Sequence, residues 1–422
     1  MASMLPVKIL NPIHVEIMNS ICHKWISAGA VRSLSGDAGK YWSQEIELLE
    51  EASNFPDIFW PGEGALSVYL QKYPEWRDYI MIPLHSGVKN CHEAFNPLRI
   101  WETYPEILSY LIDETLESMN AEDCTRAVKF AGILSHLIGD TGQAAHIADP
   151  RIISALFQDR DDIYLIHTFI ENNPLVFYPN HEYHAKSLGD SSAELKWMLL
   201  QKMAVLKRNS LRTIVPIMSN MLSGNFAFAA QYASNTIGEC ADLLADLLLT
   251  LFQIVHGGKN DAKIVSLCEL ESESCFCDGM FNYLPQINRI PGEKRGDSIP
   301  LDIGFGEQCG IALLPNLFPG FCERRVAFAQ YLLPPGVFRF FRFSCGLNRR
   351  AERNETSCIF EIYLDEKLVW SSSAISVDSP CTGICIDLGN ANSLRISTAD
   401  GRKNSIQTKF FYPCFINPEL VK

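Results

Sequence analysis

Residues 135–146 read SHLIGDTGQAAH, and this stretch decides how the first half of the chain is interpreted. His136 and Asp140 are four residues apart, so on a helix their side chains lie on one face, about one turn apart. Gly139 and Gly142 favour an end to that helix, after which His146 folds back beside the pair. An imidazole and a carboxylate that converge from one helix face form half of a site for a metal ion such as Zn²⁺.

The same four-residue step recurs downstream, where His167 is followed by Glu171. Helical bundles hold multi-metal carboxylate sites with pairs of this kind, presented inward from two helices. Asp140 and Glu171 lie among apolar residues, where an unpaired carboxylate would be costly. The alternative is a pair of solvated His–acid contacts on helix surfaces. Two such pairs with His146 between them favour the metal site.

The pattern around this stretch predicts a helical domain. From Pro12 to about Phe252, apolar residues recur at three- and four-residue spacing over 42–52, 104–117, 119–139, 193–206 and 238–255. Asp123 is placed to cap the helix over 119–139. The residues HGGKND at 256–261 interrupt the pattern, so we predict one domain over residues 1–258 and a second over 259–422.

The second domain has a different pattern. Short β-rich segments at 337–343, 358–364, 384–388 and 393–397 are separated by Gly, Asn, Asp and Pro, which is typical of an antiparallel sandwich. The predicted fold class is therefore a multidomain α + β chain, with an all-α domain followed by an all-β sandwich.

Composition separates the same two parts. The 422 residues carry a net charge of -13, and residues 261–422 hold 17 Lys and Arg against 19 Asp and Glu, so about -11 falls on the helical part. This balance argues against a general nucleic-acid or anionic-membrane coat. Nine of the 10 histidines lie between His14 and His184, whereas ten of the 14 cysteines follow residue 260. The histidines therefore mark the helical domain and the cysteines mark the second one.

The compartment is left open by the sequence. We identify no signal peptide at the N-terminus and no apolar run of 18 residues, so no transmembrane segment is expected. The cysteine-rich second half and a possible glycosylation sequon at Asn354 leave secretion open.

The stretch around residues 136–146 resembles a motif of the zinc-dependent phospholipase C family and its single-strand-specific nuclease relatives. The residues that carry the resemblance are His136, Asp140, Gln143 and His146. The resemblance extends over most of residues 10–175. It implies an aspartate in a first loop, and Asp57 in the segment NFPDIF (54–59) resembles that position as it occurs in glycosylphosphatidylinositol-cleaving phospholipase D. The nucleases usually have Asp at the position of Glu171. A glutamate there resembles the phospholipase branch of the family.

Two positions of the resemblance have competing candidates. An early histidine is expected in the first helix. His14 resembles the phospholipase D context and is favoured, whereas His23 resembles the bacterial phospholipase C motif. A further histidine is expected between Asp57 and His136. His85 has the better spacing and His92 the more similar surroundings, so both stay open.

The resemblance implies two or three zinc ions and hydrolysis of a phosphodiester. Asp140 would bridge two ions and Asp57 would orient or deprotonate water, with the remaining ligands drawn from His14 or His23, His85 or His92, His136, His146, His167 and Glu171. No Trp precedes His14, so the family's N-terminal Trp ligand has no counterpart and a third ion is left open. The implied substrate is a phospholipid or glycolipid head group. The alternatives are a single-strand-specific nuclease or nucleotidase, and a non-catalytic glycan-binding protein stabilised by metal.

The second domain carries a softer resemblance. This domain resembles the carbohydrate-binding module attached to glycosidases (NPCBM-like), which is a jelly-roll sandwich. The resemblance covers about residues 297–412 and includes YLLPPGVFRF at 331–340 and FEIYLDEKLVWS at 360–371. This resemblance implies an accessory domain that binds a glycan. The partners expected for the whole chain are thus a phosphodiester substrate, most simply a lipid, and a glycan, with no nucleic acid.

Overall fold

The computed structural model describes residues 21–58, 73–91, 99–148, 151, 167–170, 182–258, 264–277, 285–291, 298–315, 326–349, 357–401 and 412–422. The chain forms two compact units. The first comprises Met1–Leu188 and Leu206–Gly258, and the second comprises Gly189–Val205 and Lys259–Lys422. The first unit is helical and the second is built around a β-sandwich, which confirms the predicted fold class.

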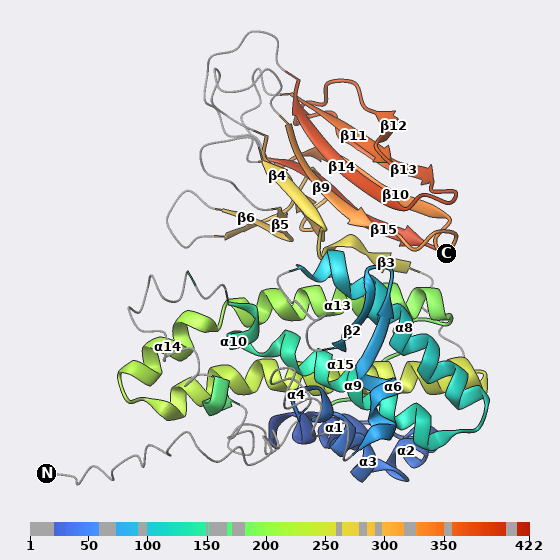
Figure 1. The fold of residues 1–422 in the computed structure, drawn as a ribbon. Coiled ribbons are helices and arrows are strands. Elements are labelled where there is room, and N and C mark those ends of the chain that lie inside the picture. Colours follow the sequence, from blue (N-terminus) through green and yellow to red (C-terminus); the bar gives the residue numbers. More distant parts are fainter. Residues whose placement is uncertain are drawn as a thin grey trace, which may run out of the picture. The chain divides into compact units, whose positions relative to one another are not determined.

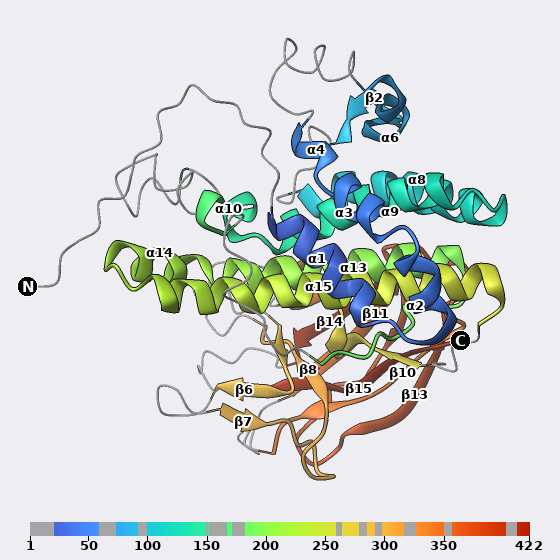
Figure 2. The ribbon, with the colours of Figure 1, turned by 90° about the horizontal axis from the view of Figure 1, so that it is seen from below.

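The described helices of the first unit surround one central helix. They are α1 (Ile21–Arg32), α2 (Gly36–Ser43), α3 (Ile46–Ala52), α4 (Phe55–Ile58), η1 (Pro74–Trp76), α6 (Arg77–Ile80), α8 (Ile100–Asn120), α9 (Cys124–Gly142), α10 (Ala144–Ile147), α14 (Ile214–Leu222) and α15 (Phe226–His256), with the hairpin β1 (Met81–Leu84) and β2 (Gly87–Asn90). Helix α9 is the central one, since it packs against α1, α3, α8 and α15 (Figures 1 and 2). The helix predicted over 42–52 is divided between α2 and α3, because Glu45 has a non-helical backbone.

Glycines let two neighbouring helices approach α9 closely. A Cβ atom at Gly132 would lie 2.3 Å from the Cβ of Ala52 at the end of α3, and one at Gly139 would lie 2.6 Å from the His23 ring on α1. A buried hydrogen bond of 2.9 Å between Ser27 and Ser135 also joins α1 to α9. These close approaches place side chains from α1 and from the chain after α3 against one face of α9.

Asp123 caps α9, as the sequence predicts. Its side chain accepts a hydrogen bond of 2.9 Å from the backbone N–H of Arg126. We expect Asp123→Ala to lower the free energy of unfolding by about 0.5–2 kcal/mol, because a first-turn donor loses its acceptor. Urea titration would measure the shift. Asp37→Ala is the matched control: it removes an exposed ion pair with Lys40, and its unfolding midpoint should stay close to that of the wild type. Equal midpoints for the two variants would contradict the capping role.

The second unit contains two antiparallel sheets. One has the order β13 (Cys381–Asp387), β10 (Phe340–Leu347), β15 (Pro413–Val421), β8 (Gly310–Ala312) and β5 (Gln286–Ile287), with β3 (Ile264–Ser266) also paired to β15. The other has the order β12 (Lys367–Ser371), β11 (Cys358–Leu364), β14 (Ser393–Asp400), β9 (Val326–Leu332) and β4 (Ser274–Cys277). A separate ribbon pairs β6 (Arg289–Pro291) with β7 (Ser298–Pro300).

The core of the sandwich lies between the two sheets. Phe360 on β11 meets Phe415 on β15 edge to face at 5.2 Å between ring centroids, and Phe343 on β10 meets Trp370 on β12 at 5.4 Å. Strand β11 coincides with the predicted segment 358–364, whereas β10 begins three residues later than predicted, at Phe340. The described cysteines of this unit that occur as free thiols are Cys268, Cys275, Cys309, Cys345, Cys358, Cys381, Cys385 and Cys414.

Helix α13 (Ser192–Leu211) contributes its first part to the second unit. The indole N–H of Trp197 donates a 2.8 Å hydrogen bond to the carbonyl of Leu332 on β9. Near the end of the chain, Lys422 donates to Glu194 at 2.8 Å and to Asp190 at 3.2 Å. The predicted division after residue 258 assigned all of α13 to the first domain, and those exact domain limits stay a prediction. Among the described helices, none combines the length and apolar character that a bilayer span requires.

Candidate metal centre

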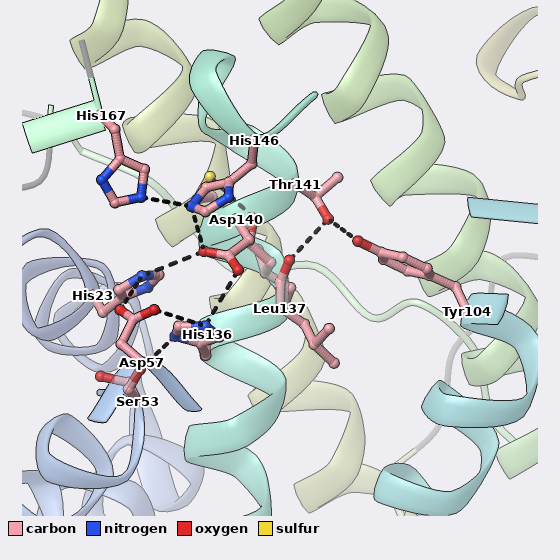
Figure 3. A network of polar contacts seen from close by, with 12 residues as sticks. His23, Ser53, Asp57, Tyr104, His136, Leu137, Asp140, Thr141, His146 and His167 are labelled. Carbon is pink, nitrogen blue, oxygen red and sulfur yellow. Dashed lines mark hydrogen bonds and ion pairs between the residues drawn. The ribbon is translucent and has the colours of Figure 1, made fainter. Parts of the chain in front are cut away.

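Side chains from four helices and one short helical segment meet beside the C-terminal half of α9. They are His23 from α1, Asp57 from α4, His136 and Asp140 from α9, His146 from α10, and His167 from the segment 167–170 (Figure 3). Asp140 occupies the middle of this group. The five elements come from different parts of the chain, between residues 21 and 170, so their convergence is a property of the tertiary fold.

The Asp140 carboxylate contacts the group through both oxygens. Its Oδ2 lies 3.2 Å from His136 Nε2, whereas its Oδ1 lies 3.4 Å from His146 Nε2 and 3.5 Å from His23 Nε2. The two oxygens thus face different imidazoles. A carboxylate arranged in this way is able to join two neighbouring cation positions, one on each oxygen.

Asp57 closes one side of the group. Its carboxylate oxygens lie 3.7 Å from His23 Nε2 and 3.7 Å from His136 Nε2, and the two imidazole rings are 4.3 Å apart. The Asp57 side chain is 14% exposed, compared with 4% for Asp140. Asp57 is therefore the carboxylate of the group with more access to solvent.

His146 and His167 form the other side. Their Nε2 atoms are 3.1 Å apart and their rings are nearly perpendicular. At this distance the two nitrogens either share one proton or face the same cation. The His146 nitrogen also faces Asp140, at 3.4 Å, so His146 lies between this carboxylate and His167.

The charges of the group reinforce one another. Burial opposes the charged form of His136, but the Asp140 and Asp57 carboxylates outweigh it and raise the pKa of His136 to about 9. Burial likewise opposes the ionised form of Asp140, and the surrounding imidazoles, His136 first, hold the pKa of this carboxyl well below its ordinary value. The buried Asp140 carboxylate and the partly exposed Asp57 carboxylate, beside several imidazoles, form a site that favours bound positive charge.

The orientation of His136 is set by a residue that the sequence did not reveal. Its Nδ1–H donates a 2.9 Å hydrogen bond to the backbone carbonyl of Ser53, the residue after α3. This contact turns Nε2 toward Asp57 and Asp140, and it favours the tautomer in which Nε2 carries the lone pair. A backbone acceptor carries no side-chain signal, so only the close packing of α3 on α9 could have indicated it.

His23, Asp57 and His136 form a group able to hold a metal ion, since one ligand atom from each lies within 4.8 Å of the others. Nitrogen and oxygen atoms about 2.0–2.2 Å from a tetrahedral Zn²⁺ lie about 3.3–3.5 Å from each other. The Nε2 atoms of His23 and His136 each lie 3.7 Å from an oxygen of Asp57, which is close to this spacing. The donor set of neutral imidazoles and carboxylates is also one that Zn²⁺ prefers.

The remaining candidates from the sequence do not join the described group. His85 lies in the turn between β1 and β2 with its side chain 97% exposed, and its Nδ1 is 2.6 Å from Glu106 on α8. His14, His92 and Glu171 lie outside the described residues. The choices between His14 and His23, and between His85 and His92, therefore stay predictions, although His23 is the one that the structure brings to Asp57 and His136.

The position of His85 leads to a discriminating prediction. We expect His85→Ala to retain the metal content of the wild-type chain, because the side chain faces solvent and Glu106 instead of the Asp140 group. Elemental analysis of the purified variant would measure this, with His92→Ala prepared in parallel. Loss of one ion in His85→Ala alone would assign His85 as a ligand and would require the β1–β2 turn to move.

The fold and the site together define a two-unit protein, in which a helical unit carries a histidine–carboxylate group able to hold metal and a β-sandwich forms most of the second unit. The family described as NPCBM/NEW2 domain matches residues 329–411, so the second unit contains a domain of this kind. No curated protein matches the chain.

Solved structures with similarity fall into two groups. The CBM51 module of a Clostridium perfringens GH95 protein, in complex with methyl-galactose, is 21% identical; the match covers 37% of this chain and 99% of that chain, with a TM-score of 0.26. Alpha toxin from Clostridium absonum is 10% identical over 96% of this chain and 98% of that chain, with a TM-score of 0.37. Alpha-toxin from an avian strain of Clostridium perfringens is 10% identical over 94% and 98%, with a TM-score of 0.32. These TM-scores are too low to support an argument about activity.

Proposed function

We propose that the helical unit is a zinc-dependent phosphodiesterase of the phospholipase C type, acting on the head group of a phospholipid or glycolipid. The observation that carries the proposal is the arrangement around Asp140, whose two oxygens face His136 on one side and His146 and His23 on the other. A buried carboxylate between two sets of imidazoles is suited to hold two ions side by side, as hydrolytic two-metal sites do.

The ligands would be divided between two positions. Asp57 and His136 would hold one ion and His146 and His167 another, with Asp140 shared between them. His23 lies near oxygens of both Asp57 and Asp140, and Glu171 is proposed as a further ligand of the second ion. Bound zinc would supply a Lewis acid for the phosphoryl oxygens and a lowered pKa for a coordinated water. The chain's own contribution is to orient these donors. The Ser53 carbonyl holds the His136 ring, and the partly exposed Asp57 carboxylate would accept a proton from water entering the site.

The test is a measurement of metal content together with phosphodiester hydrolysis. The expected result is two or three zinc ions per chain and release of a phosphorylated head group from phospholipid vesicles. Activity on single-stranded DNA in place of lipid would favour the nuclease alternative. Stoichiometric zinc with no turnover on either substrate would favour the non-catalytic alternative, and a chain purified without metal would refute the proposal.

For the second unit we propose glycan binding as an accessory function. The support is the match of residues 329–411 to the NPCBM/NEW2 domain, within a unit that contains two antiparallel sheets. Glycan-array binding by the full chain, followed by calorimetry with the best ligand, would test it. The expected result is binding that survives removal of metal with a chelator, since the histidine–carboxylate group lies in the other unit.

A further inference from the structure

The helical hairpin formed by α14 and the start of α15 exposes large apolar side chains. The two helices pack on each other and are joined by the turn Ser223-Gly224-Asn225, in which Gly224 has a φ of +74° (Figures 1 and 2). Leu222 before the turn is 61% exposed, and Phe226 and Phe228 after it are 51% and 60% exposed. We call these three side chains and the turn between them the hairpin tip. Val215 and Tyr232 extend the exposed apolar surface away from it along each helix.

The hairpin tip carries no charge in an otherwise acidic protein. No charged residue occurs from Thr213 to Gly238, and no Asp or Glu occurs between Glu194 and Glu239, although the chain has a net charge of -13. The charges nearest to this segment on its N-terminal side within the helical unit are the cations Lys207, Arg208 and Arg212, which we call the cationic margin. On the C-terminal side Glu239 follows, and its carboxylate accepts a 2.9 Å hydrogen bond from the side chain of Asn209. A surface with exposed Phe and Leu and no charged side chain, next to a margin with three cations and Glu239, complements a lipid bilayer, which offers an apolar interior beneath phosphate-bearing head groups.

A series of contacts leads from the hairpin tip to one side of the candidate metal centre. The Phe226 ring is 6.0 Å from the ring of Phe169. Phe169 is two residues from His167, whose Nε2 is 3.1 Å from that of His146. A bilayer in contact with the tip would therefore lie toward the side of the helical unit that carries His167 and His146.

We propose that the hairpin tip is a membrane-docking surface, which inserts Leu222, Phe226 and Phe228 into the interfacial region of a lipid bilayer. The apolar side chains leave water for the acyl region, while the polar turn and the cationic margin stay among the head groups. Only the role of docking rests on the proposed function: docking would bring a lipid head group to the metal centre. Binding itself requires no metal.

The test uses the full chain and its flotation with phosphatidylcholine vesicles, with and without phosphatidylglycerol. The variant Leu222→Ser/Phe228→Ser removes the two most exposed apolar side chains of the tip, and Leu368→Ser/Val369→Ser, on the exposed strand β12, is the matched control. We expect the tip variant to lower the vesicle partition coefficient by about tenfold or more, because apolar burial supplies most of the affinity. The control should bind like the wild type. Phosphatidylglycerol should strengthen binding in a salt-dependent way.

A second measurement places the tip in the bilayer directly. In Phe228→Trp, brominated lipids should quench more tryptophan fluorescence than they do in the wild type. Equal flotation of wild type and tip variant, or no added quenching, would overturn the proposal. It would also be overturned if the wild type formed a dimer that the tip variant lacked, while vesicle binding was unchanged.

One further comparison distinguishes membrane docking from catalysis. The tip variant should hydrolyse the water-soluble diester p-nitrophenylphosphorylcholine at the wild-type rate but lose activity on vesicles, and the wild type stripped of zinc should still float with lipid. If the wild type floats but hydrolyses neither substrate, docking stands and the proposed function fails.

Discussion

Replacing Asp140 by Asn should abolish zinc binding and phosphodiester hydrolysis together. Asp140 is the side chain that faces three imidazoles, at 3.2–3.5 Å, and the substitution keeps its size while removing its charge. Loss of an outer-shell partner of a metal site already costs about 10–100-fold in affinity, so loss of the central carboxylate should exceed that range. Elemental analysis and turnover on phospholipid vesicles would measure the two effects.

A buried carboxylate elsewhere in the same unit provides the matched control. Asp246 on α15 accepts hydrogen bonds from the Tyr183 hydroxyl at 2.9 Å and from the backbone N–H of Lys186 at 2.6 Å. Asp246→Asn should lower the unfolding midpoint but leave zinc content per folded chain unchanged. If Asp140→Asn retained zinc and turnover, the Asp140 group would not be a metal centre.

The stability of the metal-free protein should depend on pH. The pKa of His136 is raised from 6.5 to about 9 in the folded chain, so the stability that its protonation contributes is complete below about pH 6.5 and is lost as the pH rises through about 9. The zinc-stripped wild type should therefore become less stable over this interval. In Asp140→Asn the decline should be smaller, because the carboxylate that favours His136 protonation most is gone. Urea titrations at fixed pH values would measure both slopes.

Gly139→Ala should disable the site without removing any ligand. The added Cβ would lie 2.6 Å from Nδ1 and 2.7 Å from Cε1 of His23, and His23 is buried, so its ring must shift away from Asp57 and Asp140. Displacing a ligand in this way should weaken zinc binding by about 10–100-fold, and the overpacking should cost about 1–3 kcal/mol of stability. Zinc titration by calorimetry and urea unfolding would give the two quantities.

A double-mutant cycle tests whether Gly139→Ala weakens zinc binding by displacing His23. If Gly139→Ala acts through His23, it should weaken zinc binding much less in a His23→Ala background, since the displaced ring is already absent. Gly29→Ala on α1 is the control, because its added Cβ would press on the Ala241 Cβ at 3.3 Å and not on a proposed metal ligand. Additive effects of Gly139→Ala and His23→Ala would show that the clash does not act on this ligand.

Local sequence patterns were sufficient for the parts of the molecule that depend on neighbours in the chain. Asp123 was predicted to cap α9 and does so, because an N-cap contact spans only three residues. The strand over 358–364 was predicted with its observed limits, since alternation and turn residues are local signals. His136 and Asp140 were expected on one helix face, and their 3.2 Å contact follows from the i, i+4 spacing within α9.

The positions of side chains that reach the site from other elements could be determined only from the tertiary structure. The preference for His14 over His23 rested on motif similarity, whereas the position of His23 beside Asp140 depends on the close approach of α1 to Gly139. The spacing of His85 suited a ligand, yet the β1–β2 turn directs it to Glu106. The Ser53 carbonyl orients His136 across 83 residues. Helix periodicity and capping are decided by residues within one or two turns, so the sequence alone predicts the helices, the strands and the His136–Asp140 half-site. The complete group requires helix-to-helix packing distances, which are decided by the shapes of buried side chains from distant segments.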